Sequence, residues 1–87
     1  MDFSNLKGKV FFKDKFVSAD KAKVHVLNHS LHFASAVFEG VRVYNKKPLF
    51  LKDHVARLLR SSKIMCLKTS YSQSKLCRII LKLIKLN

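Results

Sequence analysis

The chain has 87 residues, 48% of them hydrophobic and 26% charged, and its formal net charge at pH 7 is +13. A chain of this length forms at most one small domain with a thin margin of stability, because it buries only about 60–70% of its unfolded surface. The composition argues against intrinsic disorder, and no apolar run reaches the roughly 18 residues of a membrane-spanning helix. Residues 1–7 are expected to be a poorly ordered end without a signal peptide, which makes the cytoplasm the default location.

The charge is unevenly distributed along the chain. No Asp or Glu follows Asp53, whereas Lys and Arg continue to the end. Such an excess is typical of a surface that binds nucleic acid or an anionic membrane, but it also fits a portion of a larger protein whose remainder carries the balancing acids. We favour the larger protein, because Lys outnumbers Arg and the basic residues are spread rather than clustered. Cys66 and Cys77 are expected to be buried, reduced thiols.

The first part of the chain predicts a hairpin and a short helix. Residues 10–17 place Phe and Val on both sides of a Lys-Asp-Lys centre, which predicts two short strands around a turn. After a polar connection, residues 23–27 alternate between residue types and are expected to be extended. Asn28 then suits the N-cap of a short helix over residues 29–35.

Residues 36–44 give the clearest strand prediction. Their alternation places Val37, Glu39, Val41 and Val43 on one face and Phe38, Gly40, Arg42 and Tyr44 on the other. Gly40 within this strand is expected to mark the close approach of a ligand or of another backbone segment. The sequence N-K-K-P at residues 45–48 predicts a turn, and residues 49–51 are expected to begin the returning strand.

Two helices are predicted in the last part of the chain. Asp53 suits the N-cap of a helix over residues 54–65, and a second helix is expected over residues 74–86. The first helix has an apolar stripe formed by Val55, Leu58, Leu59 and Ser62. Because strands come first and helices last, we expect an α+β fold: one domain over residues 1–87, with a small antiparallel sheet and two C-terminal helices.

Two motifs carry the strongest functional signal. Residues 29–42 read H-S-L-H-F-A-S-A-V-F-E-G-V-R, and residues 53–58 read D-H-V-A-R-L. Together they resemble the N-terminal signature of the branched-chain aminotransferases, fold-type IV enzymes that use pyridoxal phosphate (PLP). The pair His29 and His32, followed by an aromatic residue, favours this subgroup over the related D-amino-acid aminotransferases and aminodeoxychorismate lyases. The resemblance implies the smaller N-terminal domain of a homo-oligomeric enzyme that transfers the amino group of Leu, Ile or Val to 2-oxoglutarate.

Arg57 is the candidate cofactor-binding residue. The resemblance implies that it contacts the phosphate of PLP, and a phosphate dianion suits the permanently charged, planar donor fork of an arginine. The residues alone leave a second interpretation open, in which Arg57 only forms a surface ion pair with Asp53, one turn earlier on the same helix; such pairs contribute little.

Phe38, Phe33 and Gly40 are the candidate substrate-binding residues. The resemblance implies that Phe38 lines the apolar pocket for the substrate side chain, and such a pocket requires groups of this kind. Phe33 stands where the family usually has tyrosine, and Ala34 stands where glycine is usual, so a hydroxyl group is missing and a methyl group is added. From the residues alone, both phenylalanines could equally be core aromatics.

No catalytic residue and no metal site is predicted within the chain. His25, His29 and His32 follow an H-x3-H-x2-H spacing, but no carboxylate or cysteine stands at a supporting position. Glu39 has no partner carboxylate for acid–base chemistry.

The family reaction also requires a lysine that bonds to PLP, which such enzymes keep in a larger C-terminal domain. No lysine of this sequence stands in a matching context. We therefore expect a truncated or split sequence that is inactive alone and does not hold PLP stably, with a second polypeptide as a possible source of the missing domain. The alternative is a non-enzymatic basic module. Lys75, Arg78, Lys82 and Lys85 share one helical face, which could bind an anionic membrane or nucleic acid.

Overall fold

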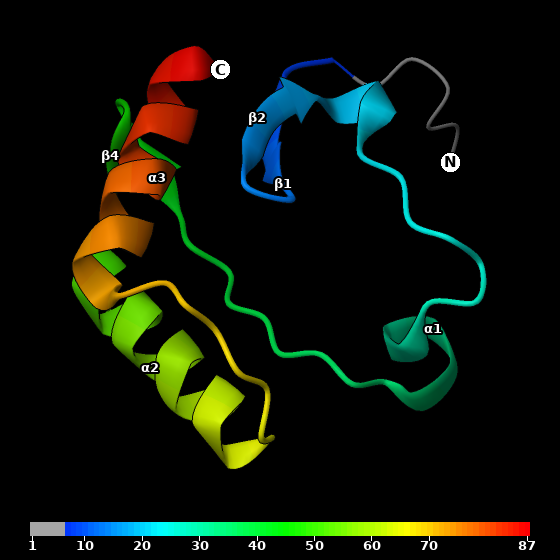
Figure 1. Cartoon of the computed structure of the whole chain (residues 1–87). Helices are drawn as coiled ribbons and strands as arrows, with labels where there is room; N and C mark the ends of the chain where they lie inside the picture. The colour runs from blue at the N-terminus through cyan, green and yellow to red at the C-terminus, as the bar shows by residue number, and fades with distance from the viewer. Residues whose placement is uncertain (1–6) are drawn as a thin grey trace.

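The computed structural model describes residues 7–87 (Figure 1), so nearly all of the predicted poorly ordered end lies outside the described residues. The fold is α+β, as predicted, with two C-terminal helices and two separate two-stranded antiparallel sheets. The elements in chain order are β1 (Lys9–Phe12), β2 (Lys15–Ser18), the 3-10 turn η1 (Ala19–Lys21), α1 (His29–Phe33), β3 (Val43–Tyr44), β4 (Lys47–Pro48), α2 (Leu51–Ile64) and α3 (Gln73–Leu86).

The first hairpin forms where the sequence predicts it. Phe11 pairs with Phe16 across the two strands, and their rings meet edge to face with centroids 5.0 Å apart. The turn residues Lys13 and Asp14 have φ of 50° and 66°, and positive φ at both central positions is what a two-residue type I′ turn requires. The ring of Phe11 also lies 6.1 Å from that of Tyr71, which joins the hairpin to the segment before α3.

Asn87 fastens the end of α3 to β1. Its side-chain Oδ1 accepts a hydrogen bond from the Lys9 backbone N–H at 2.8 Å, and its Nδ2 donates to the carbonyls of Lys9 at 3.0 Å and Leu83 at 2.9 Å. Gly8 lies beside this contact with a φ of +93°, and a Cβ atom there would collide with Asn87 Oδ1. Glycine is therefore required at position 8 both by its backbone conformation and by its neighbour.

The predicted short helix is confirmed, although α1 ends two residues earlier than expected. The side chain of Asn28 accepts a hydrogen bond from the Ser30 N–H at 2.9 Å, and Ala34 closes the helix in the left-handed conformation with a φ of 53°. The prediction that residues 23–27 are extended is wrong at the end of this segment, where Val26 and Leu27 form a turn. The cause is local: His25 Nδ1 accepts a hydrogen bond from the Leu27 N–H at 3.0 Å.

The prediction of a strand over residues 36–44 is wrong for most of its length. Only Val43 and Tyr44 pair, with β4, around a turn at Asn45 and Lys46. Residues 36–42 follow an extended course without a ladder partner among the described residues, yet their burial alternates as predicted. In this segment Val37, Glu39 and Val41 are half-buried, whereas Ala36, Phe38 and Gly40 are exposed. The alternation of residue types predicts which side chains are buried. A β-strand also needs a neighbouring strand for its backbone hydrogen bonds, and the sequence pattern does not supply one.

The sequence analysis expected residues 49–51 to begin a returning strand, and this prediction is wrong. The Leu49 N–H donates to the Arg42 carbonyl at 2.8 Å, after which Phe50 turns the chain with a φ of 55° and α2 begins at Leu51. Asp53 is consequently not the N-cap but lies within the first turn, where a carboxylate still interacts favourably with the helix dipole.

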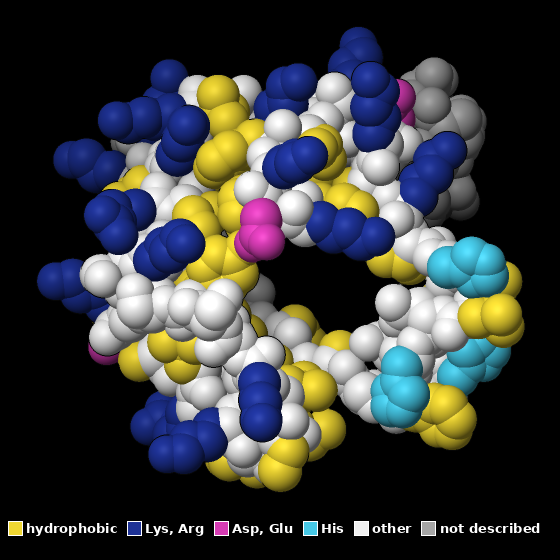
Figure 2. All heavy atoms as spheres, in the orientation of Figure 1, with side chains coloured by type: hydrophobic (Ala, Val, Ile, Leu, Met, Phe, Trp, Pro, Cys, Tyr) yellow, Lys and Arg dark blue, Asp and Glu magenta, His cyan; other side chains and the backbone are white. Residues whose placement is uncertain are grey.

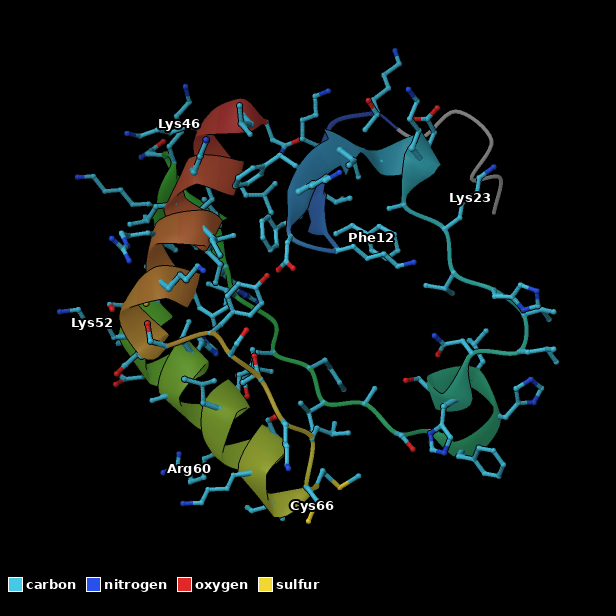
Figure 3. The ribbon with its side chains drawn as sticks, viewed as in Figure 1. Phe12, Lys23, Lys46, Lys52, Arg60 and Cys66 are labelled. Atoms are coloured by element: carbon cyan, nitrogen blue, oxygen red, sulfur yellow. The ribbon has the colours of Figure 1, made fainter. Side chains whose placement is uncertain are left out.

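The two long helices pack against each other and contain the most buried side chain. Val55 on α2 is 2% exposed, and Ser62, further along the predicted stripe, is 9% exposed and donates its hydroxyl to the Leu67 carbonyl. Cys77 is half-buried, but Cys66 is exposed at the turn that ends α2 (Figure 3), so the prediction of a buried thiol is wrong there. Tight turns place residues outward, and Cys66 occupies one with a φ of 58°.

An opening separates the part of the chain around α1 from the helices (Figure 2). The histidine side chains visible in this view gather around α1, whereas Lys and Arg cover the side formed by the helices and hairpins. Several large apolar side chains along the connecting segment are exposed, namely Val24, Val26, Leu27, Leu31, Phe33 and Phe38. The candidate site described below therefore depends on how residues 36–42 contact α2.

Candidate functional site

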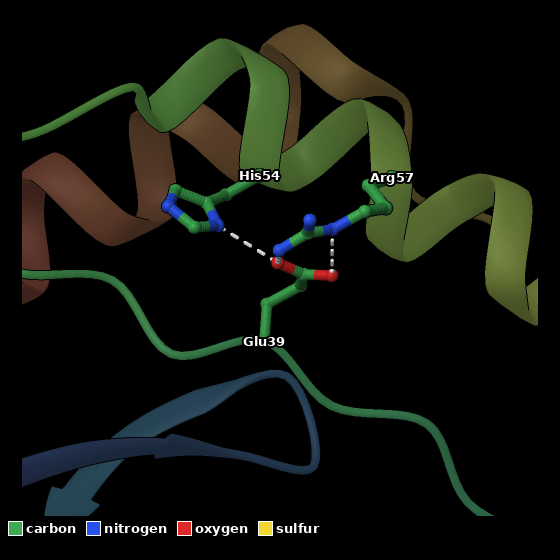
Figure 4. A network of polar contacts seen from close by, with 3 residues as sticks. All are labelled: Glu39, His54 and Arg57. Carbon is green, nitrogen blue, oxygen red and sulfur yellow. Dashed lines mark hydrogen bonds and ion pairs between the residues drawn. The ribbon is translucent and has the colours of Figure 1, made fainter.

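Three polar side chains meet between the extended segment and the first turns of α2 (Figure 4). Arg57 Nε donates to Glu39 Oε2 at 2.7 Å, and Arg57 Nη2 donates to Glu39 Oε1 at 2.6 Å. His54 Nδ1 lies 2.7 Å from Glu39 Oε1. His54 and Arg57 stand three residues apart on the helix and hence on the same face. The single carboxylate of Glu39 thus contacts two side chains on the same face of α2.

The contact joins the nearly buried carboxylate of Glu39 to the exposed guanidinium of Arg57. The side chain of Glu39 is 10% exposed, that of His54 is 21% exposed, and that of Arg57 is 60% exposed. The hydrogen bonds from Arg57, and then those from His54, lower the pKa of the Glu39 carboxyl from its ordinary 4.5 to about 2. The same hydrogen bonds raise the pKa of Arg57. Since an ionised carboxylate can only accept hydrogen bonds, His54 carries its proton on Nδ1.

A first cavity lies on the outer side of this contact. Its volume is about 530 Å³, and it is lined by Phe50, Asp53, His54, Ala56, Arg57 and Arg60. Arg57 borders this cavity, and Arg60 stands one turn further along α2 (Figure 3). The interpretation of Arg57 as the partner of Asp53 is wrong, because its ion pair is with Glu39.

A second, more apolar cavity is lined by Glu39 itself. Its volume is about 300 Å³, and it is lined by Val37, Phe38, Glu39, Val41, His54, Val55, Leu58 and Ile80. His54 borders both cavities, whereas Arg57 does not border the one that contains Phe38. The structure thus places Arg57 and Phe38 in two different cavities that share His54 as a lining residue.

The candidate substrate residues are open rather than packed. Phe38 is 90% exposed and Phe33 is 71% exposed, so the interpretation of the two rings as core aromatics is wrong. A Cβ atom at Gly40 would meet nothing within 4 Å, and the predicted close approach of another backbone segment is therefore not found in the described chain. Phe33 lies on α1 with its ring 4.7 Å from that of His29 and borders neither cavity.

The three spaced histidines have local partners. His25 Nδ1 bonds to the Leu27 backbone, and His32 Nε2 lies 2.8 Å from the Val26 carbonyl. Within residues 7–87, no group of three His, Cys, Asp or Glu side chains is placed to hold a metal ion.

Glu39 is the site residue that the sequence analysis missed. The sequence suggested no role for Glu39, because no second carboxylate stands near it to form an acid–base pair. A signal was available, because Glu39 stands between Val37 and Val41 on the face predicted to be covered, and a carboxylate on such a face requires a cationic partner.

Residues 36–87 match the model of the family described as amino-transferase class IV. The chain belongs to this family. The matched part includes Glu39, His54 and Arg57, and so contains the whole polar contact described above.

Curated class-IV relatives extend the likeness toward the N-terminus. A probable branched-chain-amino-acid aminotransferase of Rickettsia felis is 40% identical over 78 residues, which cover 90% of this chain and 27% of that protein. A putative branched-chain-amino-acid aminotransferase of Methanocaldococcus jannaschii is 33% identical over 79 residues, covering 91% and 27%. The branched-chain-amino-acid aminotransferase of Salmonella typhimurium is 36% identical over 80 residues, covering 84% and 26%. The chain spans about a quarter of the length of these relatives.

The basic face of α3 is partly engaged by the chain itself. The Lys75 ammonium lies 5.1 Å from the centre of the Tyr71 ring, and that of Lys82 lies 5.0 Å from the centre of the Phe16 ring. No helix in the part of the chain that the structure describes combines the length and the apolar character needed to cross a membrane.

Proposed function

We propose that this chain forms the phosphate-binding side, and one wall of the substrate pocket, of a PLP-dependent aminotransferase that acts on branched-chain amino acids. The observation that carries the proposal is the placement of Arg57. It lies in the segment that matches the family, it borders a cavity, and it retains N–H groups that Glu39 does not use. The relatives named as branched-chain-amino-acid aminotransferases support branched-chain amino acids as the substrates.

The residues around Arg57 suit a phosphate group. A guanidinium has five N–H donors, of which the contact with Glu39 uses two, so three are left for an anion. Arg60 borders the same cavity and adds positive charge, whereas Asp53 opposes it. Arg57 would hold the phosphate, and the bound cofactor supplies an electron sink for the charge that develops on the substrate carbon.

The second cavity suits an aliphatic side chain. Its walls include Val37, Val41, Val55 and Leu58, and Phe38 lies at its open edge. These side chains would exclude water from the substrate, and Gly40 leaves space beside Phe38. Phe33 would have to approach from α1 in the assembled enzyme, so its substrate role stays a prediction.

The lysine that bonds to the cofactor is proposed to come from outside these residues. Every lysine of the chain lies in its described part, each is exposed, and none borders either cavity. We therefore propose that the lysine is supplied by further residues of the same enzyme, in one polypeptide or two, within a homo-oligomer of the kind the resemblance implies. The 87 residues alone would be inactive and would not hold PLP stably.

The test is complementation. The chain mixed with PLP, leucine and 2-oxoglutarate is expected to form no glutamate, and clear turnover would contradict the proposal. Adding the remaining three quarters of the Rickettsia felis relative is expected to restore turnover. In that mixture Arg57→Ala should lower kcat/KM by about 10- to 100-fold, as expected when a charged hydrogen bond is lost. Arg78→Ala, the same change on α3 away from both cavities, should leave it unchanged.

The alternative function, a basic module for anionic membranes or nucleic acid, has weaker structural support. Its helix face includes Lys75 and Lys82, which already lie over aromatic rings of the chain. The apolar residues of α3 that would enter a lipid surface are mostly half-buried against α2 and β1. The high net charge alone favours this function, and the aminotransferase accounts for more of the observations.

A further inference from the structure

The segment that carries Phe38 is held in place by few contacts. Residues 36–42 have no ladder partner among the described residues, and Phe38 and Gly40 point into open space. Inward contacts come from the half-buried Val37 and Val41 and from Glu39. Glu39 alone among these three residues contributes directional bonds, namely two to Arg57 and one to His54. The position of Phe38 relative to α2 therefore depends strongly on one carboxylate.

The same carboxylate restrains the guanidinium of Arg57. A side chain that is 60% exposed normally samples many rotamers, and an anion that binds it must offset the cost of ordering it. The paired bonds at 2.7 and 2.6 Å fix both the position and the plane of the guanidinium. They occupy Nε and one N–H of Nη2, which leaves both N–H groups of Nη1 without a bond to Glu39 on a residue that borders the cavity.

We propose that Glu39 is a positioning residue of this site: it orients Arg57 for an anionic phosphate and ties the segment bearing Phe38 to the same helix. The inference rests on the proposed function for the identity of the anion, but the orientation of Arg57 is a property of the chain itself. The carboxylate performs this role over the working pH range because its pKa is about 2 and it stays ionised.

Two effects of Glu39 on phosphate affinity have opposite signs. A negative charge beside the site repels phosphate, so removing the charge by itself should strengthen binding. Loss of orientation should weaken binding, because the anion must then order the arginine. The sign of the change in affinity therefore separates a positioning role from a mere neighbouring charge.

The experiment measures inorganic phosphate binding to the full 87-residue chain by NMR, with the Arg57 Nε–H and the backbone amides of residues 37–41 as reporters. Glu39→Gln is expected to weaken phosphate binding by about two- to tenfold, the cost of immobilising one long side chain. Asp53→Asn is the matched control, since Asp53 lines the cavity that Arg57 borders but forms no ion pair with Arg57. It removes the same charge and is expected to leave affinity unchanged or raised.

Orientation is read in the absence of phosphate. Glu39→Gln should speed hydrogen exchange at Arg57 Nε–H and shift the amides of residues 37–41, with the helical signals of α3 showing that the fold persists. If this variant does not fold, Glu39→Asp, which keeps the charge on a shorter side chain, replaces it and should show smaller changes of the same kind.

Unchanged exchange at Arg57, or phosphate affinity that rises in Glu39→Gln as in Asp53→Asn, would overturn the inference. If the unaltered chain binds no phosphate while the exchange and amide changes occur as expected, the phosphate role of Arg57 fails and the positioning role of Glu39 stands.

Discussion

Truncating Val55 to alanine should destabilise the chain more than any other single change from valine to alanine in its described part. Val55 is 2% exposed, and together with Ile80 of α3 it lines the cavity that contains Phe38. The change removes two buried carbon groups at about 0.8 kcal/mol each, and the space left behind raises the loss to about 2–3 kcal/mol. The better helix propensity of alanine returns about 0.6 kcal/mol. The net loss is about 2 kcal/mol, a large share of the roughly 4–13 kcal/mol expected for this length.

The assay is thermal and urea unfolding followed by circular dichroism at 222 nm. For a domain of this size a loss of about 2 kcal/mol lowers Tm by about 8–16 °C. Val24→Ala is the control, since the same atoms are removed from a side chain that is 53% exposed, outside any helix or strand. If the two variants differ by less than about 0.5 kcal/mol, Val55 does not occupy the packed position on which the helix pair, and with it the site, is argued to depend.

Three further predictions concern the ends, the pH response and the charged face. Gly8→Ala and Asn87→Ala should each lower the unfolding free energy by about 1–2 kcal/mol in urea melts, the first through strain at positive φ and the second through lost side-chain hydrogen bonds; the double variant should lose less than the sum. The pKa of Glu39 is lowered in the folded chain, so its stabilising contribution is complete above pH 4.5 and is lost as the pH falls toward 2. A carbon-13 NMR titration of the Glu39 carboxyl should give a midpoint near 2. A midpoint at 4.5 would show that the contact with Arg57 does not form in solution. Vesicles rich in anionic lipid should retain little of the chain at 150 mM salt, and strong retention abolished by changing Lys75 and Lys82 to glutamine would favour the basic module instead.

Local signals predicted local structure well. The hairpin over residues 10–17 was readable because its turn lies between two runs of Phe and Val, and the short helix was readable because Asn28 can cap it. The second long helix begins at Gln73, one residue from its expected start, since Ser72 provides the N-cap. These elements depend on residues within one turn of each other, and such information is contained in a short stretch of sequence.

The failures have two physical causes: dependence on a distant partner, and left-handed or turn conformations that the residue types do not signal. Residues 36–42 alternate as a strand should, but alternation gives the side-chain faces and not the neighbour that completes a ladder. The start of α2 was misplaced because Phe50, which has no capping side chain, turns the chain through a left-handed conformation. The sequence analysis singled out Arg57 as a candidate, but its partner Glu39 lies 18 residues away, and spacing on a helix predicts only neighbours three or four positions apart.

Two independent features favour a larger enzyme around this chain over a self-contained basic module. Within the described residues, six of the fourteen exposed large apolar side chains lie along residues 24–38, on the connecting segment and α1, whereas α3 exposes two, Leu81 and Leu86. A module that binds through α3 would need more of them on that helix. Exposed apolar groups that cluster in this way are typical of an interface. The second feature is the guanidinium of Arg57, which retains donors that Glu39 does not use and borders one cavity, while Glu39 and His54 border a more apolar one. A module that recognises anionic surfaces has no need of this arrangement, whereas it suits the aminotransferase proposed above, which would hold a phosphate and an aliphatic side chain in neighbouring cavities.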